Sequence, residues 1–504
     1  MICVTIGRGR HKMLLAEHAH VARLGAPLAE LRLDYILRSI NLNRLVEKRP
    51  TQVVMTCRRP QDGGKWRGSE ADRIILLRSA IATGVDYIDI EEDIAHQIPR
   101  YGKTKRIISY HNLKETPSDI ETIHARMLKT DPDIIKIATF ANSPADNARV
   151  LRLIEKSPVP TIAFCMGEIG MISRIICLQK GSPFTFAALS AERMMAPGQF
   201  TAQQLINTYR AQSINRDTEF LGVIADPVGH SLSPAIHNQL LQLDDVNKIY
   251  LPIRVPREHL DEFMDSVSEL GITGLSVTIP HKESVLRFVN GLDEDVAGIR
   301  AANTLVVKDN SVFAYNTDCR AAMLSLAHTE GKFEDKQPFF GRKALILGSG
   351  GVAKAMAFGL IRGGAELIVA GRNTRAAEQM ALDLKCKSID WAARHSVDVD
   401  YLINCTPVGM HPDLNNSPFD VDKLNPETLI FDTVYNPQQT LLVKGGKEIK
   451  CRVITGVDMF VRQAAMQYKL FTGKDPNIQE MRRIFIETIN PAKFKHSTAR
   501  PAEK

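Results

Sequence analysis

The sequence lacks the features that mark several large classes of protein. It has no run of about 18 apolar residues, the length that a membrane-spanning helix needs, and no long low-complexity tract of the kind found in fibrous or disordered chains. Its 8 cysteines are scattered, without a C-x-x-C pair or a Cys/His ligand spacing, so neither a disulfide framework nor a metal site is predicted. Charge of one sign is not in excess either. The 64 Lys and Arg against 57 Asp and Glu leave a net +7, which does not predict a nucleic-acid partner and suits anionic small molecules equally well.

The remaining composition is that of a globular chain, with 44% hydrophobic and 24% charged residues. Its 504 residues exceed one ordinary core, so roughly two to four domains are expected. The first residues hold only a short apolar run interrupted by Arg8 and Arg10, which is not the pattern of a secretion or import signal. We expect a cytoplasmic protein, because scattered cysteines suit a reducing compartment.

Up to about residue 215, short β-branched runs alternate with longer amphipathic stretches. This alternation predicts an α/β fold with a parallel sheet, and eight strands at a spacing of roughly 20 to 35 residues suit a (β/α)8 barrel. An open doubly wound sheet is the alternative. The predicted strands are Ile2–Ile6, Leu28–Leu33, Val53–Cys57, Tyr87–Glu91, Arg106–Tyr110, Ile134–Thr139, Thr161–Cys165 and Phe184–Leu189.

Polar residues lie at or just past the carboxyl ends of these strands, where barrel enzymes build their active sites. They are Glu30, Arg32, Arg58, Glu91, His111, Lys136, Arg174 and Gln199. Lys136 interrupts an apolar strand, and an amine among apolar walls beside a cation becomes a nucleophile toward ketones, although a lysine that merely reaches out of a strand end is the alternative. His111 could then act as general base with Glu91 orienting its ring, and Arg58 and Arg174 could bind a carboxylate.

These residues resemble type I 3-dehydroquinate dehydratase across the whole block. The motifs that carry the resemblance are Glu30-Leu-Arg-Leu-Asp-Tyr, Thr56-Cys-Arg58, Asp89-Ile-Glu91, Ser109-Tyr-His111-Asn, Lys136-Ile-Ala, Gly167-Glu-Ile-Gly-Met-Ile-Ser-Arg174 and Ala196-Pro-Gly-Gln199. The resemblance implies a Schiff base on Lys136, proton transfer by His111 and a carboxylate site at Arg174 and Gln199, with Glu30, Arg32 and Arg58 contacting the rest of the substrate. Met195 stands where the family usually has serine, so weaker substrate binding is expected.

A second block follows the polar stretch Gln212–Thr218, with predicted strands Leu221–Ala225, Tyr250–Ile253, Leu275–Ile279 and Thr304–Val307. Beyond the charged segment Thr329–Arg342, a strand at Ala344–Leu347, a glycine turn and a helix at Val352–Ile361 give the strand-turn-helix context of a dinucleotide site. The next strand, Glu366–Ala370, ends without an acid and runs into Arg372, Asn373, Thr374 and Arg375. Cations and hydroxyls at this place favour NADP over NAD.

The second block resembles shikimate dehydrogenase from about Phe220 to about Ile489. The motifs include Ser231-Leu-Ser233-Pro, Val277-Thr278-Ile-Pro-His-Lys282, Ala302-Asn303-Thr and Asn316-Thr-Asp318. The resemblance implies Lys282 and Asp318 as the catalytic pair, although a surface salt bridge is the alternative reading of these two residues alone. It further implies substrate contacts by Ser231, Ser233, Thr278, Asn303, Tyr435 and Gln463, and cofactor contacts by Gly348, Ser349, Gly350, Gly351, Val352, Ala353, Arg372, Asn373, Thr374, Arg375, Thr406 and Gly456.

Three positions depart from the second family's pattern: Gly371 replaces an asparagine, Cys319 replaces a glycine in many members and Ser276 replaces an asparagine in many members. The first departure removes one adenosine contact but keeps Arg372. NADP therefore remains the expected cofactor.

The product of the first reaction is the substrate of the second, and the order of the blocks matches the bifunctional dehydratase/dehydrogenase family. The resemblance implies a barrel at 1–215, a substrate-binding domain at 219–328 completed by helices at 457–490, an NADP-binding Rossmann domain at 329–456 and a disordered tail at 491–504. A quinate-preferring second half and a non-catalytic ligand-sensing regulator are the alternatives. The expected partners are small molecules, with neither nucleic acid nor membrane, and the oligomeric state is left open.

Overall fold

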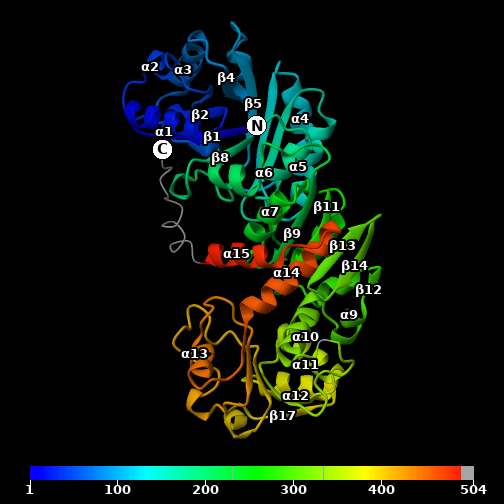
Figure 1. The fold of residues 1–504 in the computed structure, drawn as a ribbon. Helices are drawn as coiled ribbons and strands as arrows, with labels where there is room; N and C mark the ends of the chain where they lie inside the picture. Colours follow the sequence, from blue (N-terminus) through cyan, green and yellow to red (C-terminus); the bar gives the residue numbers. More distant parts are fainter. Residues whose placement is uncertain (230, 333, 490–504) are drawn as a thin grey trace. The chain divides into compact units, whose positions relative to one another are not determined.

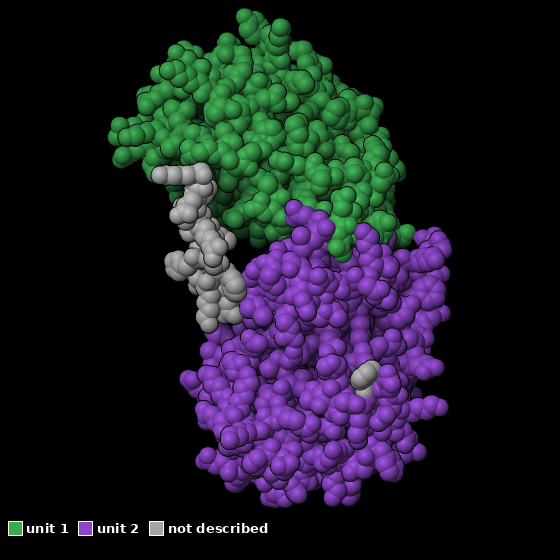
Figure 2. Space-filling model, in the orientation of Figure 1, with its two compact units in different colours: residues 1–234, 244–272 green, residues 235–243, 273–504 purple. Residues whose placement is uncertain are grey.

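The computed structural model describes residues 1–229, 231–332 and 334–489, which form helices and strands in alternation (Figure 1). The chain divides into two compact units (Figure 2). The first comprises Met1–Pro234 and Asp244–Ile272, and the second comprises Ala235–Leu243 and Thr273–Lys504. Each unit is an α/β structure of its own.

The first unit contains the predicted barrel sheet. Its eight strands follow the order β7-β6-β5-β4-β3-β2-β1-β8, and every pair in this order is parallel. Helices cover the outer face, which is why the strands are buried on both faces. The strands are β1 (Ile2–Ile6), β2 (Leu28–Arg32), β3 (Gln52–Thr56), β4 (Tyr87–Glu91), β5 (Lys105–His111), β6 (Ile134–Phe140), β7 (Thr161–Met166) and β8 (Thr185–Ala188). The helices are α1 (His11–Arg23), α2 (Leu42–Val46), α3 (Glu70–Ala82), α4 (Ile120–Leu128), α5 (Ala145–Lys156) and α6 (Ser173–Gln179).

Apolar side chains fill the amino-terminal part of the barrel interior. The buried cluster takes residues from every strand, among them Cys3, Leu28 and Val54. Phe184 packs edge-on against Tyr87 and Phe186, with ring centroids 6.2 Å and 5.5 Å apart. Because side chains alternate between the faces of a strand, the residues two positions further along point into the same interior, one layer nearer the carboxyl ends.

The first unit also contains a parallel pair of strands after the barrel, β9 (Glu219–Ala225) and β10 (Lys248–Arg254), and helix α8 (Leu260–Ser266). Arg152 on α5 donates from Nε and Nη2 to the carboxylate of Glu269, at 2.8 Å each. Ser143 similarly hydrogen-bonds Glu262 on α8. The barrel and this strand pair are therefore compact together, and the family-based domain ranges, which divide the chain by a different criterion, stay predictions.

The second unit holds an antiparallel segment, β11-β13-β14, with β12 parallel to β14, and a six-stranded parallel sheet in the order β17-β16-β15-β18-β19-β20. That order is the 3-2-1-4-5-6 arrangement of a dinucleotide-binding fold. The strands are β11 (Ile272–Val277), β12 (Gly291–Leu292), β13 (Thr304–Lys308), β14 (Ser311–Tyr315), β15 (Lys343–Leu347), β16 (Glu366–Ala370), β17 (Lys387–Ile389), β18 (Tyr401–Asn404), β19 (Leu429–Asp432) and β20 (Val453–Thr455). The helices are α7 (Ser233–Leu243), most of which belongs to this unit, α9 (Glu294–Ile299), α10 (Thr317–Glu330), α11 (Gly351–Arg362), α12 (Thr374–Leu384), α13 (Leu441–Glu448), α14 (Gly456–Thr472) and α15 (Ile478–Ile489).

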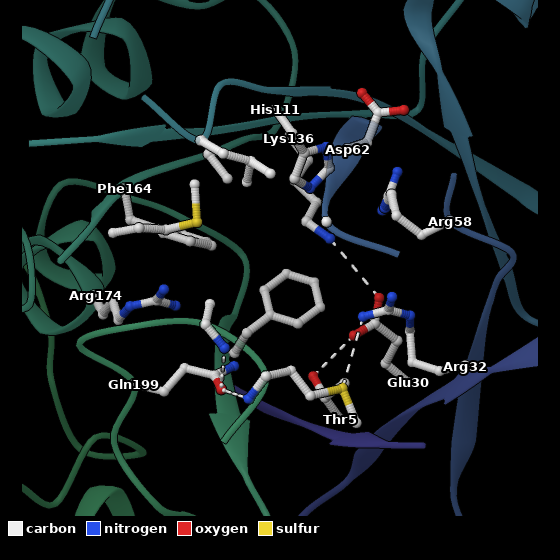
Figure 3. A pocket seen from close by; sticks show the side chains of 17 residues that line it. Thr5, Glu30, Arg32, Arg58, Asp62, His111, Lys136, Phe164, Arg174 and Gln199 are labelled. Carbon is white, nitrogen blue, oxygen red and sulfur yellow. Dashed lines mark hydrogen bonds and ion pairs between the residues drawn. The ribbon is translucent and has the colours of Figure 1, made fainter. Parts of the chain in front are cut away.

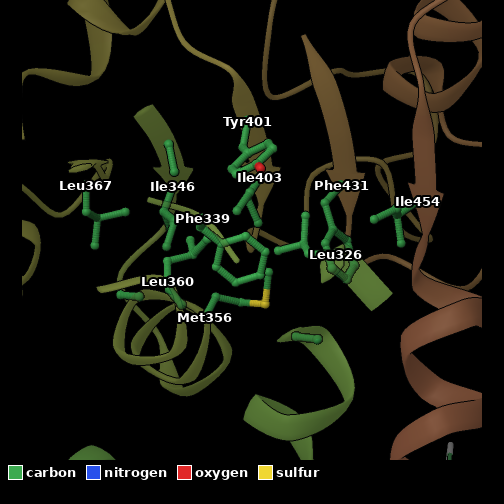
Figure 4. Packing of buried hydrophobic residues seen from close by; sticks show 14 of the residues in the cluster. Leu326, Phe339, Ile346, Met356, Leu360, Leu367, Tyr401, Ile403, Phe431 and Ile454 are labelled. Carbon is green, nitrogen blue, oxygen red and sulfur yellow. The ribbon is translucent and has the colours of Figure 1, made fainter. Parts of the chain in front are cut away.

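One face of the six-stranded sheet packs against α10 and α11 through fully buried side chains (Figure 4). Leu326 of α10 and Met356 and Leu360 of α11 are 0% exposed and meet Ile346 and Ile403 of the central strands. This packing fixes α11 against β15, so the turn between them has a defined shape. The site that the turn forms is therefore positioned by the core below it.

The fold class is confirmed, including the barrel and the Rossmann-type sheet. Strand β11 ends at Val277, two residues before the predicted end, and the segment that follows contains the exposed Ile279. Strands β12, β14 and β17–β20 were not predicted. The predicted disordered tail 491–504 lies outside the described residues. Within them, no helix has the length and apolarity that crossing a membrane requires.

Candidate active sites

The carboxyl ends of the barrel strands enclose a cavity of about 90 Å³ (Figure 3). Every predicted barrel residue except Glu91 lines it: Glu30, Arg32, Arg58, His111, Lys136, Arg174 and Gln199. Figure 3 shows Arg174 and Gln199 on the opposite side of the cavity from Arg32 and Arg58. The register explains this grouping. Thr5, Glu30, Asp89 and Lys136 each stand two positions after a member of the apolar interior cluster, and Arg32 and His111 stand two positions further.

Lys136 is held between carboxylates and an aromatic ring. Its Nζ lies 2.9 Å from Asp89 Oδ2, 3.8 Å from Glu30 Oε1 and 4.1 Å from the ring centroid of Phe186. The residue is only 5% exposed. Burial alone would raise the pKa of Asp89, but Arg58 and Lys136 hold that pKa below its usual value. Asp89 is therefore a permanent anion that positions the amine.

Glu30 is fixed by neighbours from adjacent strands, and Arg32 by Asp34 in the turn that follows β2. Thr5 and Thr56 donate to the two oxygens of Glu30, at 2.8 Å each. Asp34 accepts from Nε and Nη2 of Arg32, at 2.9 Å and 2.8 Å. Both groups therefore face the cavity in a single orientation, with few rotamers left to lose on binding a ligand.

His111 is neutral in this environment. Burial lowers the pKa of His111 well below its usual value, and the charges of Arg58 and Lys136 lower it further. Glu91 binds Arg58 at 2.8 Å and Arg73 at 2.6 Å. In the described residues, Nδ1 of His111 is buried without a hydrogen-bond partner. The predicted contact by which Glu91 orients His111 thus stays a prediction, while Arg58 links Glu91 to the cavity.

Arg174 brings a buried positive charge to the cavity wall. It is 1% exposed and lies over the ring of Phe164, 4.3 Å from its centroid. Among the described residues Arg174 has no recorded ion pair, and its Nε is buried without a partner. Burial lowers the pKa of Arg174 to about 10, so the group is still a cation at neutral pH. An unpaired buried cation facing a cavity is an anion-binding group.

Gln199 is the last residue of the segment Met195–Gln199, which contributes Met195, Ala196 and Gln199 to the cavity wall. Its Oε1 accepts from the backbone N–H groups of Met195, at 2.8 Å, and Ala196, at 3.3 Å. The N–H of Gly167 donates to Pro197 O at 3.1 Å. Gly198, at φ +72°, approaches Gly167 so closely that a Cβ would lie 2.2 Å from its carbonyl oxygen. Gln199 thus shapes the segment with its carbonyl oxygen, which leaves the amide nitrogen as its donor.

Sequence reasoning did not single out Asp89 as a site residue. The signal was present, since Asp89 is two positions before Glu91 on one strand and therefore shares its face. Thr5, Thr56 and Phe186 were missed for a different reason: each is unremarkable in its own strand and gains a role only from its neighbour across the sheet.

The second unit brings Lys282 and Asp318 together, with Nζ 2.5 Å from Oδ2. The side chains are 16% and 13% exposed, so one side of the pair is open. Asp318 is in the first turn of α10, where a carboxylate is favoured by the helix dipole. A Cβ on Gly351 would lie 3.7 Å from Cδ of Lys282. The predicted proton donor therefore borders the glycine turn.

Asn303 anchors a buried polar network next to this pair. Its Oδ1 accepts from the N–H of Thr317 at 2.8 Å, and its Nδ2 donates to Thr317 Oγ1 at 2.9 Å. Gln463 Oε1 accepts from the same hydroxyl at 3.5 Å. Gln467, which was not predicted, donates to Asn303 O at 3.1 Å. The structure thus brings Asn303 and Gln463 into one network at the start of α10.

The glycine turn has the geometry of a phosphate site. Gly348, at φ +114°, donates from its N–H to Ala370 O at 2.8 Å, and a Cβ there would lie 3.0 Å from Cys405 O. Gly350 precedes α11 and makes no side-chain cap, and a Cβ on it would meet nothing within 4 Å. The space beside Gly350 is therefore open where α11 begins, at the carboxyl end of β15, which is where a dinucleotide-binding fold places a phosphate.

The turn after β16 presents two free cations. Arg372 and Arg375 are exposed, and within 1–229, 231–332 and 334–489 neither has a recorded ion pair. Asn373 caps α12 by accepting from Ala376 N–H at 3.2 Å. Asn373 is thus engaged in local structure, whereas the two guanidinium groups are available to a phosphate.

Three further residues that were predicted to bind the cofactor or the substrate, Thr406, Gly456 and Tyr435, make contacts within the protein. Thr406 donates from Oγ1 to Asn404 Oδ1 at 2.7 Å. Gly456 begins α14 so close to the preceding chain that a Cβ would lie 2.5 Å from Thr433 O. Tyr435 packs on Phe460, with centroids 5.1 Å apart, and burial raises its pKa.

Three of the predicted substrate contacts, Thr278, Ser231 and Ser233, take part in local hydrogen bonds to the backbone. Thr278 accepts from His281 N–H through its backbone carbonyl at 2.8 Å. Ser231 and Ser233 belong to the first unit, in the segment after β9, where Ser233 N–H donates to Ser231 Oγ at 3.4 Å.

No cluster of His, Cys, Asp and Glu able to hold a metal ion occurs in the described part of the chain.

Three family models match the chain. Residues 2–216 match the type I 3-dehydroquinase model. Residues 223–305 match the shikimate dehydrogenase substrate-binding domain, and residues 456–484 match the shikimate 5'-dehydrogenase C-terminal domain.

Similar proteins cover both halves of the chain. A chloroplastic bifunctional 3-dehydroquinate dehydratase/shikimate dehydrogenase of Arabidopsis thaliana is 34% identical over 497 residues, which are 94% of this chain and 82% of that protein. A shikimate dehydrogenase (NADP⁺) of Methanocaldococcus jannaschii is 34% identical over 286 residues, covering 55% of this chain and 99% of the relative. A solved structure of a shikimate dehydrogenase in complex with NADP⁺ is 32% identical with a TM-score of 0.51, and covers 55% of this chain and 97% of that one.

Proposed function

Because this chain belongs to the family of bifunctional 3-dehydroquinate dehydratase/shikimate dehydrogenases, we propose that it converts 3-dehydroquinate to shikimate in two steps of the shikimate pathway. The barrel dehydrates the substrate through a Schiff base. The second half reduces the 3-dehydroshikimate so formed with NADPH. The observation that carries the proposal is Lys136, a buried amine in a cavity that also holds a neutral histidine and an unpaired arginine.

The barrel residues support the dehydration chemically. The Lys136 amine adds to the substrate ketone and water leaves, giving an iminium that stabilises an adjacent carbanion. Neutral His111 removes the neighbouring proton, and the same imidazolium then protonates the departing hydroxyl as water. Hydrolysis of the product iminium releases the enone and restores the amine. Asp89 holds Nζ in place at 2.9 Å and neutralises the iminium charge.

The substrate carboxylate is assigned to Arg174, whose buried guanidinium has no carboxylate of the protein beside it in the described residues. A bidentate pair would satisfy the orphaned Nε as well. Glu30, Arg32 and Arg58 then face the hydroxyl-bearing side of the ring, and the amide nitrogen of Gln199 donates to the carboxylate.

In the second half, Lys282 gives a proton to the ketone oxygen while Asp318 holds the ammonium group at 2.5 Å. NADPH supplies the hydride for this reduction. The glycine turn and the start of α11 hold its pyrophosphate, and Arg372 with Arg375 hold the 2′-phosphate. Asn303 and Gln463 bind ring hydroxyls, and Thr278 and Tyr435 complete the proposed substrate contacts of the second unit.

The test is a coupled assay on the whole chain with 3-dehydroquinate and NADPH. We expect NADPH consumption and shikimate formation, and loss of both in Lys136→Met with 3-dehydroshikimate reduction retained. Borohydride added with substrate should fix the substrate mass on Lys136. An undiminished adduct in Lys136→Met would refute the Schiff-base assignment, and a wild-type chain that forms no shikimate would refute the function.

Quinate is the competing substrate for the second half. Turnover of shikimate and quinate with NADP⁺ and NAD⁺ decides between them. A higher kcat/KM for quinate would show that the second half is a quinate dehydrogenase instead of a shikimate dehydrogenase.

A cytoplasmic location completes the proposal. All eight cysteines are free and six of them are buried, which suits a reducing compartment.

A further inference from the structure

The segment Met195–Gln199 borders the barrel cavity, and its first residue brings a thioether to the cavity wall. Met195 lines the cavity together with Ala196 and Gln199. Its neighbour Met194 points outward and is 44% exposed. The two methionines therefore differ in role, although they are adjacent and of one type.

Met195 meets the end of β1 at Gly7. A Cβ on Gly7 would lie 2.6 Å from the Cε of Met195, well inside the closest contact that two carbon atoms tolerate, and 2.8 Å from Cγ of Tyr35. Gly7 stands two positions after Thr5, so a side chain there would point into the cavity layer that holds Arg32 and His111. The methyl group of Met195 occupies the space that this missing side chain leaves.

The sulfur of Met195 has a polar neighbour. Arg32 Nη1 donates to Met195 Sδ at 3.6 Å, while the other guanidinium nitrogens of Arg32 are held by Asp34. At the same residue, the backbone N–H of Met195 donates to Gln199 Oε1 at 2.8 Å. Met195 therefore contacts Gly7 after β1, Arg32 at the end of β2 and Gln199 at the end of its own segment.

We propose that Met195 and Gly7 form a latch that holds the Met195–Gln199 segment closed over the dehydratase cavity, with Met195 as a positioning residue for Gln199 and Arg32. The inference rests on the proposed dehydratase function for its kinetic consequence. The contacts of the latch do not depend on that function. Closing the segment excludes water and places the Gln199 amide for the substrate, so the latch acts on substrate binding more than on the chemical step.

The first test is kinetic and uses the whole chain. In Met195→Ala we expect the dehydratase KM to rise about tenfold with kcat within about twofold, because a half-buried apolar contact is lost. Met195→Leu keeps an apolar group of similar volume and should stay within about threefold of the wild-type KM. The dehydratase kcat of each variant reports whether the barrel is folded, and the dehydrogenase kcat of the same preparation serves to normalise the concentration of the chain.

A double-mutant cycle isolates the contact itself. Gly7→Ala should raise KM about as much as Met195→Ala, since the added methyl collides with the thioether. In the double variant the collision with Met195 is absent, so its KM should be clearly lower than the product of the two single effects predicts. The Tyr35 contact is present in both Gly7→Ala variants and cancels in the cycle.

The second readout does not require dehydratase activity. Arg193 precedes the latch, and trypsin cleavage after it should become several-fold faster in Met195→Ala and Gly7→Ala when the segment opens. Met13→Ala, in a methionine of the same barrel on α1 that is 44% exposed, is the matched control and should change neither KM nor the cleavage rate.

Unchanged KM and unchanged cleavage in Met195→Ala, or single effects that simply multiply in the cycle, would overturn the latch. A wild-type chain without dehydratase turnover would instead refute the proposed function, and the cleavage rates alone would then judge the latch.

Discussion

At the scale of single residues, the barrel site is built by a two-residue repeat along each strand. Tyr87, Asp89 and Glu91 of β4 are successive inward positions, and they change from apolar to charged toward the carboxyl end. The same order occurs in β6, where Ile134 is followed by Lys136. Buried charges are tolerated there only because opposite charges from neighbouring strands face them, as Asp89 faces Lys136 and Arg58.

The state of His111 gives a prediction for the pH dependence of the dehydratase. Since burial lowers its pKa well below the usual value, His111 stays in the neutral, proton-accepting form as the pH falls through 6.5, and protonates only below its lowered pKa. We expect log kcat/KM of the dehydratase to remain flat through about pH 6.5 and its acid limb to appear at lower pH. The measurement is a pH profile with 3-dehydroquinate.

An ordinary exposed histidine would give the contrary profile, with activity falling about tenfold per pH unit below about pH 6.5. An acid limb at that position would show that the general base is not the buried imidazole. His111→Asn should remove the limb together with most of the activity, while the dehydrogenase of the same chain is unaffected.

At the scale of elements, both halves place function at the carboxyl ends of parallel strands. In the barrel these ends surround a cavity, and in the dinucleotide-binding sheet β15 and β16 end side by side at Leu347 and Ala370. Gly348 then turns with a positive φ and hydrogen-bonds Ala370. The glycine turn and the Arg372 turn are neighbours for this reason, although they are well separated in the sequence.

The turn between β16 and α12 is predicted to select the cofactor. Substituting Arg372 and Arg375 by alanine removes the two exposed cations, so the KM for NADPH should rise roughly 10- to 100-fold, while NADH-dependent turnover changes little. The check is steady-state kinetics with both cofactors at fixed 3-dehydroshikimate.

Lys423→Ala, an exposed cation of the same sheet domain at the loop before β19, is the control and should leave both KM values unchanged. Equal losses with NADPH and NADH would show that the arginines do not read the 2′-phosphate.

At the scale of the whole molecule, the two lysines proposed to be catalytic belong to separate compact units, with Lys136 in the first and Lys282 in the second. Neither lysine is part of an apolar core cluster. Each activity should therefore survive loss of the other. We expect Lys136→Met to retain full reduction of 3-dehydroshikimate and Lys282→Met to retain full dehydration.

A mixture of the two variants tests the whole route. We predict that the intermediate leaves one chain and enters another, so the mixture should turn 3-dehydroquinate into shikimate at a rate set by the concentrations of both chains. Measured shikimate formation in the mixture and in each variant alone checks this. A mixture as inactive as its separate parts would mean that the two sites of one chain must both be intact.

Much of the fold and of the barrel site could be predicted from the sequence, because these features depend on residues that are close together in the chain. Short apolar runs in the sequence predict where strands form, and the alternation of side chains along a strand predicts which face each residue occupies. The barrel, the Lys136 cavity and the glycine turn could therefore be predicted. Strands β15 and β16 of the parallel sheet in the second unit were predicted for the same reason, whereas its other four strands were not. Short strands such as β17 and β20 carry too few residues for a pattern.

What only the tertiary structure decided is which neighbours each group finds. The folded barrel pairs Glu91 with Arg58 and Arg73 and sets Asp89 against Lys136, contacts that the sequence did not predict. The orientation of His111 by Glu91 stays a prediction. From the sequence, Met195 was only the loss of a serine hydroxyl that contacts the substrate. The fold shows that the Met195 side chain lies next to Gly7. The sequence determines the order and facing of residues within an element. The partners of each residue depend on register between strands and on packing across them, because those contacts join residues that are far apart in the chain.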